Sequence, residues 1–137
     1  MARDIFHDLV RAGLEKEGWT ITDDPYRIEL DKTNFQIDLA AEKIIGAEKD
    51  NKKIAVEIKS FLNSSAITDF YNALGQFLSY RLALNTIEPD RTLYLAVPLD
   101  IYQEFFMTTF VKLAINEYCL KLITYDSEKG GLSQWIN

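Results

Sequence analysis

The chain has 137 residues, of which 47% are hydrophobic, so it is long enough for one domain with a proper core and too short for two. The formal net charge of −6 argues against a general DNA-coating protein, which normally carries a basic face. No window approaches the roughly 18 apolar residues of a membrane span, and the first residues do not form the apolar run of a signal peptide. We therefore expect a single cytoplasmic domain over residues 1–137, with no membrane contact.

The amino-terminal half predicts a helix followed by short strands. Apolar side chains recur at helical spacing over residues 3–17, which indicates an amphipathic helix. Asp23-Asp24-Pro25 is typical of a turn between two short extended pieces. We then expect two strands, joined by a turn at Asp50-Asn51, over residues 35–48 and 53–61.

The carboxyl-terminal half predicts two long helices between core strands. The clearest helix spans residues 66–85, where Ser64 or Ser65 can cap the first turn. Its expected apolar side consists of Ile67, Phe70, Leu74, Phe77, Leu78 and Leu82. The further expected elements are a strand at 91–97, a helix from Tyr102 to Cys119, a strand at 120–125 and a short strand ending at Trp135. This order predicts an α/β sandwich, with a mixed central β-sheet flanked by helices on both faces.

One acid and one base lie two residues apart within the predicted strand at 53–61. Because side chains alternate along a strand, Glu57 and Lys59 share one face, while Val56 and Ile58 lie on the other. Burying two opposite charges among aliphatic residues is costly unless they serve each other, a metal or a substrate. A surface salt bridge is the ordinary interpretation of such a pair. The apolar flanking residues favour a functional one.

A metal-dependent site that cleaves phosphodiesters is the functional interpretation. Asp38 and Glu57 are the expected ligands of Mg²⁺ or Mn²⁺, with the Ile58 carbonyl as a third. Lys59 would orient the attacking water and offset charge on the phosphate. The site lies in the least acidic third of the chain, next to a basic cluster at Lys49, Lys52 and Lys53, which permits local contact with DNA.

The predicted hairpin creates a difficulty for this site. A turn at Asp50-Asn51 puts Ile44 opposite Glu57 and leaves Asp38 about 20 Å away along the strand. The chain must then fold back within Leu39–Lys43, or a wider loop must begin at Gly46. Otherwise the first acid is Glu42. We favour Asp38 with a fold-back.

Other side chains are candidates for supporting roles. Gln76 and Tyr80 lie one turn apart on the predicted helix and can contact the phosphate, or they can be a solvent-side amide and a core-rim phenol. Glu15 is either an outer metal ligand or part of a solvated helix end. We expect Cys119 to be a buried structural thiol. His7 has no second histidine or cysteine with which to form a zinc site.

These residues resemble the PD-(D/E)xK nuclease superfamily, whose restriction-endonuclease-like core has this order of elements. Asp38, Glu57-Ile58-Lys59 and the helix carrying Gln76 bear the likeness, although Ile37 stands where the motif has proline. Over nearly its whole length the chain is similar to the XisH family, the cyanobacterial excision controlling factors of the fdxN element. The stretches that carry this likeness are 2–7, 18–25, 37–43, 54–61 and 73–80.

The resemblance implies a role in site-specific DNA excision, alongside a recombinase and a companion factor, XisI. It leaves two functions open. One is a Mg²⁺-dependent endonuclease acting on DNA. The other is a catalytically silent regulatory subunit that keeps the nuclease scaffold and binds its companion, an interpretation that the acidic charge favours. The apolar residues Phe105, Phe106 and Phe110 would supply either a helix core or a surface for a partner or a homodimer.

Overall fold

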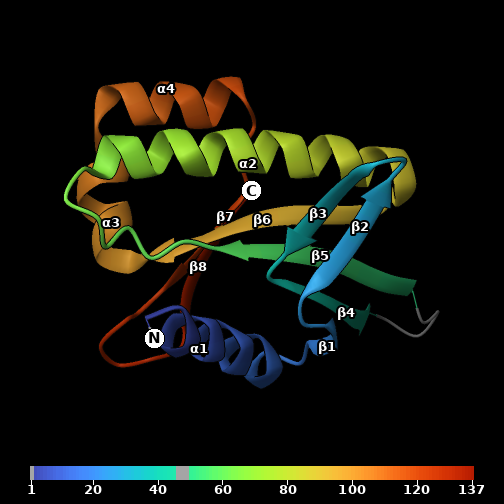
Figure 1. The fold of residues 1–137 in the computed structure, drawn as a ribbon. Coiled ribbons are helices and arrows are strands. Elements are labelled where there is room, and N and C mark those ends of the chain that lie inside the picture. The colour runs from blue at the N-terminus through green and yellow to red at the C-terminus, as the bar shows by residue number, and fades with distance from the viewer. Residues whose placement is uncertain (1, 46–49) are drawn as a thin grey trace.

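The computed structural model describes residues 2–45 and 50–137. Within these residues, a first helix is followed by five strands, and then by two helical segments and three further strands (Figure 1). The helices are α1 (Ala2–Lys16), α2 (Ala66–Ile87), α3 (Leu99–Glu104) and α4 (Thr109–Glu117), with a short 3-10 turn η1 (Phe105–Met107) between the last two. The strands are β1 (Thr20–Asp23), β2 (Tyr26–Leu30), β3 (Thr33–Ile37), β4 (Leu39–Ile45), β5 (Asp50–Ile58), β6 (Arg91–Pro98), β7 (Leu122–Tyr125) and β8 (Leu132–Ile136).

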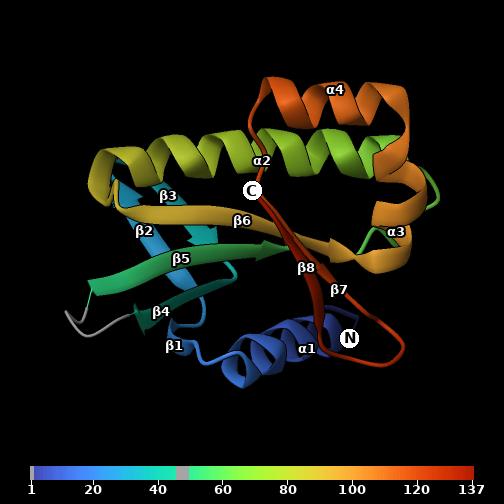
Figure 2. The ribbon, with the colours of Figure 1, turned by 180° about the vertical axis from the view of Figure 1, so that it is seen from behind.

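Six strands of the described chain form one mixed sheet in the order β1-β4-β5-β6-β7-β8. β5, β6 and β7 run parallel, whereas the other neighbouring strands are antiparallel. Because parallel neighbours need a crossover, α2 joins β5 to β6, and α3 with α4 joins β6 to β7. Figure 2 shows β7 and β8 at the edge farthest from β1. The predicted α/β fold with a mixed sheet between helices is confirmed.

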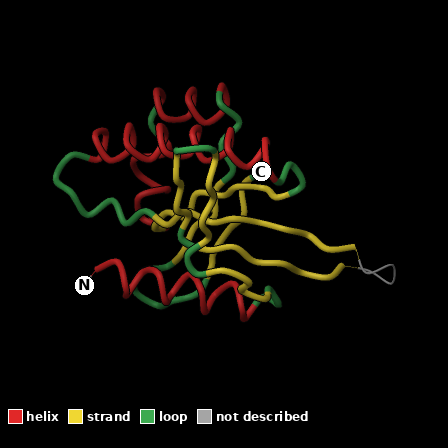
Figure 3. The backbone as a smooth tube through the Cα atoms, turned by 45° about the vertical axis from the view of Figure 1, so that its right-hand side comes forward, coloured by secondary structure: helices red, strands yellow, loops and turns green. Residues whose placement is uncertain are grey.

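Helices cover both faces of this sheet, and each face has its own core. α1 lies on one side, with α2 and α4 on the other (Figure 3). Val10 and Leu14 of α1 pack against Leu39, Ile54 and Val56 of the sheet. The core on the other face is larger and also takes in the separate β2–β3 hairpin. None of the described helices is both long and apolar enough to cross a membrane.

The turn between β4 and β5 lies earlier than the sequence predicts. Ile45 pairs with Asp50, so the expected turn residues Asp50 and Asn51 belong to β5 instead. The connection falls in residues 46–49, which lie outside the described residues. Gly46, the alternative start of a wider loop, and Lys49 of the basic cluster are among them. The turn expected from the polar Asp-Asn pair is therefore wrong.

This register brings Asp38 next to Glu57. β4 begins at Leu39 and runs on without reversing, so the fold-back expected within Leu39–Lys43 is also wrong. Leu39 pairs with Val56, and one further step along the ladder places Asp38 beside Glu57. Glu42 pairs with Lys53 at the other end of the strands. The two strands thus carry Asp38, not Glu42, to the end of β5 that holds Glu57.

The segment between β6 and β7 differs from the single helix predicted from Tyr102 to Cys119. It breaks at η1, and α4 starts after it. Phe106, which is fully buried, packs its ring at 5.5 Å from Phe61 and 5.8 Å from Phe70, measured between centroids. Phe106 therefore fills a corner of the fold, whereas Phe110 and Leu113 of α4 are 53% and 62% exposed.

Two side chains expected in the core are exposed. Leu82 of α2 is 70% exposed, because the buried residues of this helix follow a different line through Phe70, Phe77 and Leu84. Cys119 is also exposed, and its φ of 52° places it in the turn after α4. The prediction of a buried structural thiol is therefore wrong.

A cluster of one phenol and three charged side chains joins β2 to the sheet. This Arg91 cluster consists of Tyr26, Lys53, Glu88 and Arg91. Arg91 is only 6% exposed, and its Nε donates to Glu88 Oε1 at 2.7 Å. Its Nη1 donates to the Ile54 carbonyl at 2.9 Å, and Tyr26 donates to Glu88. Hydrogen bonds from Arg91 outweigh the effect of burial and lower the pKa of Glu88 to about 2.

Candidate active site

Glu57 lies near the carboxyl end of β5, on the sheet face covered by α2. The preceding residue on this face, Ala55, belongs to the core beneath α2, whereas Val56 belongs to the core beneath α1. Glu57 is 6% exposed. The Lys59 ammonium lies 3.3 Å from Glu57 Oε2, so the two side chains are on the same side, as their spacing predicts.

Main-chain hydrogen bonds hold Asp38 and Glu57 together. The Asp38 N–H donates to Glu57 Oε1 at 3.3 Å, and the Ile58 N–H donates to Asp38 Oδ2 at 2.8 Å. This exchange is possible because Asp38 stands between β3 and β4, and its carboxylate reaches the end of β5. The backbone thereby orients both carboxylates without using all their oxygen lone pairs.

The backbone of Lys59 is fixed on both sides. Its N–H donates to the Ala96 carbonyl at 2.9 Å, and its carbonyl accepts from the Tyr125 hydroxyl at 3.0 Å. Burial raises the pKa of Tyr125, with a further contribution from Asp100, so the phenol stays protonated as a donor. Lys59 therefore starts from a defined position, while its side chain remains 27% exposed. The sequence analysis expected Tyr125 only as the end of a core strand and missed the role of its hydroxyl.

Negative charge exceeds positive charge at this site. Burial, and then the neighbouring Asp38, raise the pKa of Glu57 to about 7, although Lys59 acts in the opposite direction. The pKa of Tyr80 on α2 is also raised, by burial and then by Glu57 and Asp38. A single lysine thus serves two carboxylates, and an added cation would relieve the repulsion between them.

The donor atoms fit a hard divalent cation. Mg²⁺ and Mn²⁺ prefer oxygen ligands, and Mg²⁺ is usually held by one or two carboxylates while it keeps several waters. Asp38 and Glu57 are such a pair. Within residues 2–45 and 50–137, no group of three or more His, Cys, Asp and Glu is placed to hold a metal ion. A cation bound here would therefore remain largely hydrated.

A pocket of about 320 Å³ opens at these carboxylates. Its lining comes from the β3–β4 junction, from the end of β5 and from α1, and comprises Phe6, His7, Asp38, Glu57, Ile58, Lys59 and Ser60. The sequence analysis considered His7 only as a zinc ligand and did not expect it at this site. The spacing of His7 to Val10 and Leu14, three and seven residues later, would have placed it on the buried stripe of the first helix.

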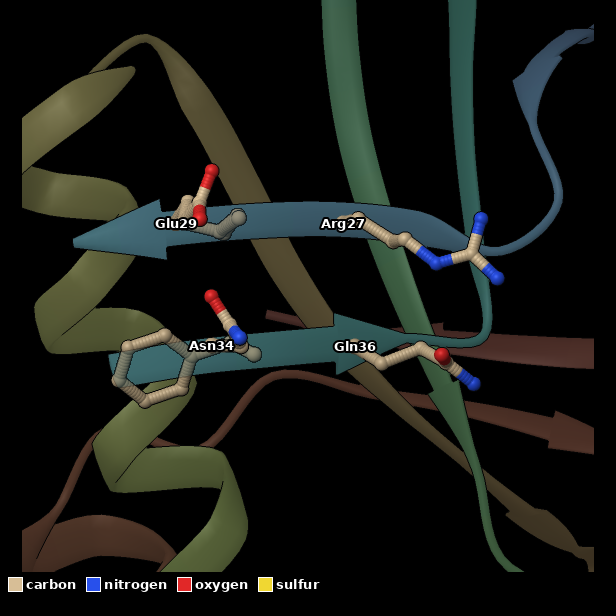
Figure 4. A pocket seen from close by; sticks show the side chains of 6 residues that line it. Arg27, Glu29, Asn34 and Gln36 are labelled. Carbon is tan, nitrogen blue, oxygen red and sulfur yellow. The ribbon is translucent and has the colours of Figure 1, made fainter. Parts of the chain in front are cut away.

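A larger pocket, of about 560 Å³, lies on the β2–β3 hairpin. Figure 4 shows the polar side chains on its two strands, which are Arg27, Glu29, Asn34 and Gln36. Arg27 pairs with Gln36 and Glu29 with Asn34 across the ladder. This set holds one acid, one base and two amides, without paired carboxylates. The smaller pocket, which holds the paired carboxylates, is therefore the candidate active site.

The remaining predicted residues lie farther from the carboxylates. Gln76 is exposed on α2, one turn before Tyr80, and makes no hydrogen bond to Asp38, Glu57 or Lys59 in the described structure. Glu15 is exposed, and its carboxylate lies 3.9 Å from the Arg11 guanidinium. Glu15 therefore belongs to the solvated end of α1.

Comparison with known proteins identifies the family. Residues 1–132 match the protein family described as XisH protein. The chain belongs to the XisH family. The match covers nearly the whole chain, including both carboxylates, Lys59 and the helices on either face. No curated protein matches this XisH chain.

Two solved structures share its fold. A crystal structure of an XisH family protein from Nostoc punctiforme is 49% identical, with a TM-score of 0.89. A fdxN element excision controlling factor protein from Anabaena variabilis is also 49% identical, with a TM-score of 0.90. Both alignments cover 98% of this chain and 100% of the other. The architecture described above is thus that of these family members.

Proposed function

We propose that this XisH chain is an excision controlling factor of a DNA element, and that it contributes a Mg²⁺-dependent phosphodiester-cleaving centre of the PD-(D/E)xK type. The observation that carries the proposal is the buried carboxylate of Glu57. It lies beside Asp38, has a pKa raised to about 7, and has one lysine as its partner in a pocket. By contrast, the pKa of Glu88 in the Arg91 cluster is lowered to about 2.

Each residue has a separate role in the proposed reaction. Asp38 and Glu57 hold Mg²⁺ or Mn²⁺, which when bound neutralises phosphate charge and makes bound water more acidic. Lys59 orients the attacking water and donates to a phosphate oxygen. Gln76, which is exposed on the neighbouring helix, contacts the phosphate next to the scissile one.

DNA is the proposed substrate, and proteins supply the remaining contacts. A chain with a net charge of −6 lacks the basic surface needed for tight binding to DNA alone. We therefore propose that it acts in the cytoplasm with a recombinase and with the companion factor XisI, which bring the DNA to the pocket. The balanced charge of residues 42–91 permits local contact with DNA at the site.

A regulatory subunit without cleavage is the second candidate function. The observation that favours it is an exposed apolar surface on α2 and α4, where Leu82, Phe110 and Leu113 are 70%, 53% and 62% exposed. Exposed apolar side chains on neighbouring helices are typical of a protein–protein interface. On this proposal the surface binds XisI or a second copy of the chain.

Asp38→Asn tests the first proposal. The substitution keeps the side-chain shape but removes the charge, so we expect loss of Mn²⁺ binding by calorimetry and of Mg²⁺-dependent nicking of supercoiled DNA with XisI present. Asp31→Asn is the matched control, because Asp31 is exposed with a φ of 53°, a conformation that asparagine tolerates. A folded wild-type protein that binds no divalent ion would exclude the nuclease.

Glu57→Ala distinguishes the two functions. If the chain is a nuclease, the variant loses excision of the element in cells although it still forms its complex with XisI. If the chain is a regulatory subunit, excision survives in the Glu57→Ala variant. In that case Leu113→Asp, on the exposed face of α4, abolishes excision because it breaks the complex, and the chain itself cleaves no DNA.

A further inference from the structure

His7 is a buried polar side chain at the candidate active site. It lies in the first half of α1 and is 6% exposed. Its side chain lines the same pocket as Asp38, Glu57 and Lys59. A histidine from the helix on the other side of the sheet thus reaches the carboxyl end of β5, where the proposed chemistry takes place.

One ring nitrogen of His7 is held by Asp24. Nε2 lies 2.7 Å from Asp24 Oδ1, and Asp24 Oδ2 accepts from Arg11 Nη1 at 2.6 Å. Burial acts against the charge on Asp24, but hydrogen bonds from His7 and then Arg11 outweigh it and lower the pKa of this carboxyl. An ionised carboxylate can only accept, so Nε2 carries a proton, and Nδ1 is an acceptor when the ring is neutral.

The other ring nitrogen has no partner. Nδ1 of His7 is buried and makes no hydrogen bond with any described group. Buried polar atoms without a partner are rare in folded proteins, since each costs the free energy of its lost hydration. The Asp24 contact explains the orientation of the ring but not this unused acceptor. Nδ1 is therefore a buried polar atom of a pocket-lining residue whose hydrogen-bonding capacity the described chain does not use.

The partner of Nδ1 is not a metal ion that this nitrogen coordinates directly. Within the described residues His7, Asp38 and Glu57 do not form a group placed to hold a metal together. A Mg²⁺ or Mn²⁺ ion on the two carboxylates would keep several waters, and water is a donor small enough to approach a buried nitrogen.

We propose that His7 is a positioning residue of this site, whose Nδ1 accepts a hydrogen bond from a water of the cation held by Asp38 and Glu57. The inference rests on the proposed cation site and adds a residue from α1 to it. Asp24 and Arg11 act behind His7, because they fix the tautomer and the orientation of the ring. Such outer partners typically change metal affinity by about 10- to 100-fold.

Two isosteric substitutions separate this role from a structural one. Gln in His7→Gln carries its amide near the position of Nε2, so it keeps the hydrogen bond to Asp24 and loses the Nδ1 acceptor. Asn in His7→Asn carries its amide oxygen near the position of Nδ1, so it keeps the acceptor and loses Asp24. The two variants are measured by calorimetric titration with Mn²⁺ and by thermal unfolding without metal, using the full chain.

Opposite orders are expected in the two measurements. His7→Asn unfolds at a lower temperature than His7→Gln, whereas His7→Gln binds Mn²⁺ about 10-fold more weakly than the wild type and more weakly than His7→Asn. Wild-type affinity for Mn²⁺ in both variants, or affinity that follows thermal stability, would overturn the role of His7 and leave the cation site standing. Absence of Mn²⁺ binding by the wild-type protein would overturn both.

Discussion

β5 carries two charged clusters on the same face, one at each end. At the amino end, Lys53 lies 3.6 Å from Glu88, which also accepts hydrogen bonds from Arg91 and Tyr26. At the carboxyl end, Glu57 lies beside Asp38 and is paired with Lys59. The pKa of Glu88 is lowered to about 2, mainly by Arg91, whereas burial and Asp38 raise that of Glu57 to about 7.

The difference lies in the number of cationic partners for each acid. In the Arg91 cluster, Glu88 is partly buried and has two cationic partners, Lys53 and Arg91, so the cluster stabilises the folded chain. The same two cations also lie 3.5 Å from Asp90 and 4.0 Å from Glu42, respectively. At the other end a single lysine faces two carboxylates, and the folded state retains a repulsion that a divalent cation would remove. Charge complementarity therefore separates a structural ion cluster from a proposed functional one within a single strand.

Lys59→Ala is expected to have the largest effect, and it falls on catalysis. Loss of a side chain that orients water and contacts phosphate lowers a cleavage rate by ~1,000-fold, or about 4 kcal/mol of activation free energy. The measurement is the single-turnover nicking rate with Mg²⁺. Because the Lys59 backbone is held by Ala96 and Tyr125, we expect an unchanged fold by circular dichroism.

Lys121→Ala serves as the control for this prediction, since it removes a lysine that does not line the pocket. We expect the wild-type rate in that variant. If Lys59→Ala cleaved as fast as Lys121→Ala, Lys59 would be only a charge partner of Glu57. The charged clusters at both ends of β5 would then be structural.

Arg91→Met is expected to have the next largest effect, on stability. The substitution leaves Glu88 without its main partner and removes the hydrogen bond to the Ile54 carbonyl. The free energy of unfolding, measured with urea, should therefore fall by about 3 kcal/mol. Arg27→Met, at an exposed position of the hairpin, should change it by no more than about 0.5 kcal/mol. Mn²⁺ binding should survive in both variants.

The acid side of the stability profile gives a second measurement of the same cluster. The folded-state pKa of Glu88 is about 2, below its ordinary value of 4.5. The contribution of Glu88 to the free energy of unfolding is therefore present above pH 4.5 and is lost as the pH falls through 2. This loss should be smaller in Arg91→Met, and an unchanged acid transition would show that other carboxylates control it.

The fold follows from the sequence where local pattern and tertiary structure agree. Helical periodicity places α1 and α2 to within two residues, and Pro98 marks the last residue of β6. The predicted hairpin turn is wrong because Asp and Asn are residue types that are common in turns. In the fold, Asn51 lies in a strand, and its amide donates to Glu42 across the ladder at 3.2 Å. A cross-strand partner outweighed local propensity, and no spacing rule along the chain shows that partner.

The site was predictable in composition but not in geometry. Glu57 and Lys59 share a face simply because strand side chains alternate, and that was readable from the sequence. The position of Asp38 depends on strand register. His7 comes from a helix on the opposite face, 50 residues before Glu57, so only tertiary packing brings the two into one pocket.

Glu57→Gln is expected to stabilise the protein in the absence of metal. The folded-state pKa of Glu57, about 7, exceeds its ordinary value of 4.5, so wild-type stability falls as the pH rises from 4.5 through 7. Above that range the neutral amide should raise the free energy of unfolding by ~2 kcal/mol, allowing for the lost ion pair with Lys59. Urea unfolding as a function of pH measures this effect.

Addition of Mg²⁺ should reverse the ranking, because it stabilises the wild type and leaves Glu57→Gln unchanged. Glu104→Gln, at the exposed last residue of α3, is the matched control and should behave like the wild type. A destabilised Glu57→Gln protein at alkaline pH would mean that Lys59 satisfies Glu57 as fully as Arg91 satisfies Glu88.

Gln76→Ala is expected to have the smallest effect. Gln76 is exposed on α2, one turn before Tyr80, and its proposed partner is the DNA phosphate rather than the protein. Loss of one hydrogen bond to a charged phosphate, of about 1.5 kcal/mol, should slow nicking about tenfold, with no change in stability or in Mn²⁺ affinity. Asn72→Ala removes an exposed amide one turn earlier and should leave the rate unchanged. Equal rates in the two variants would confine the proposed site to the end of β5 and its neighbours, because DNA would then not reach the face of α2.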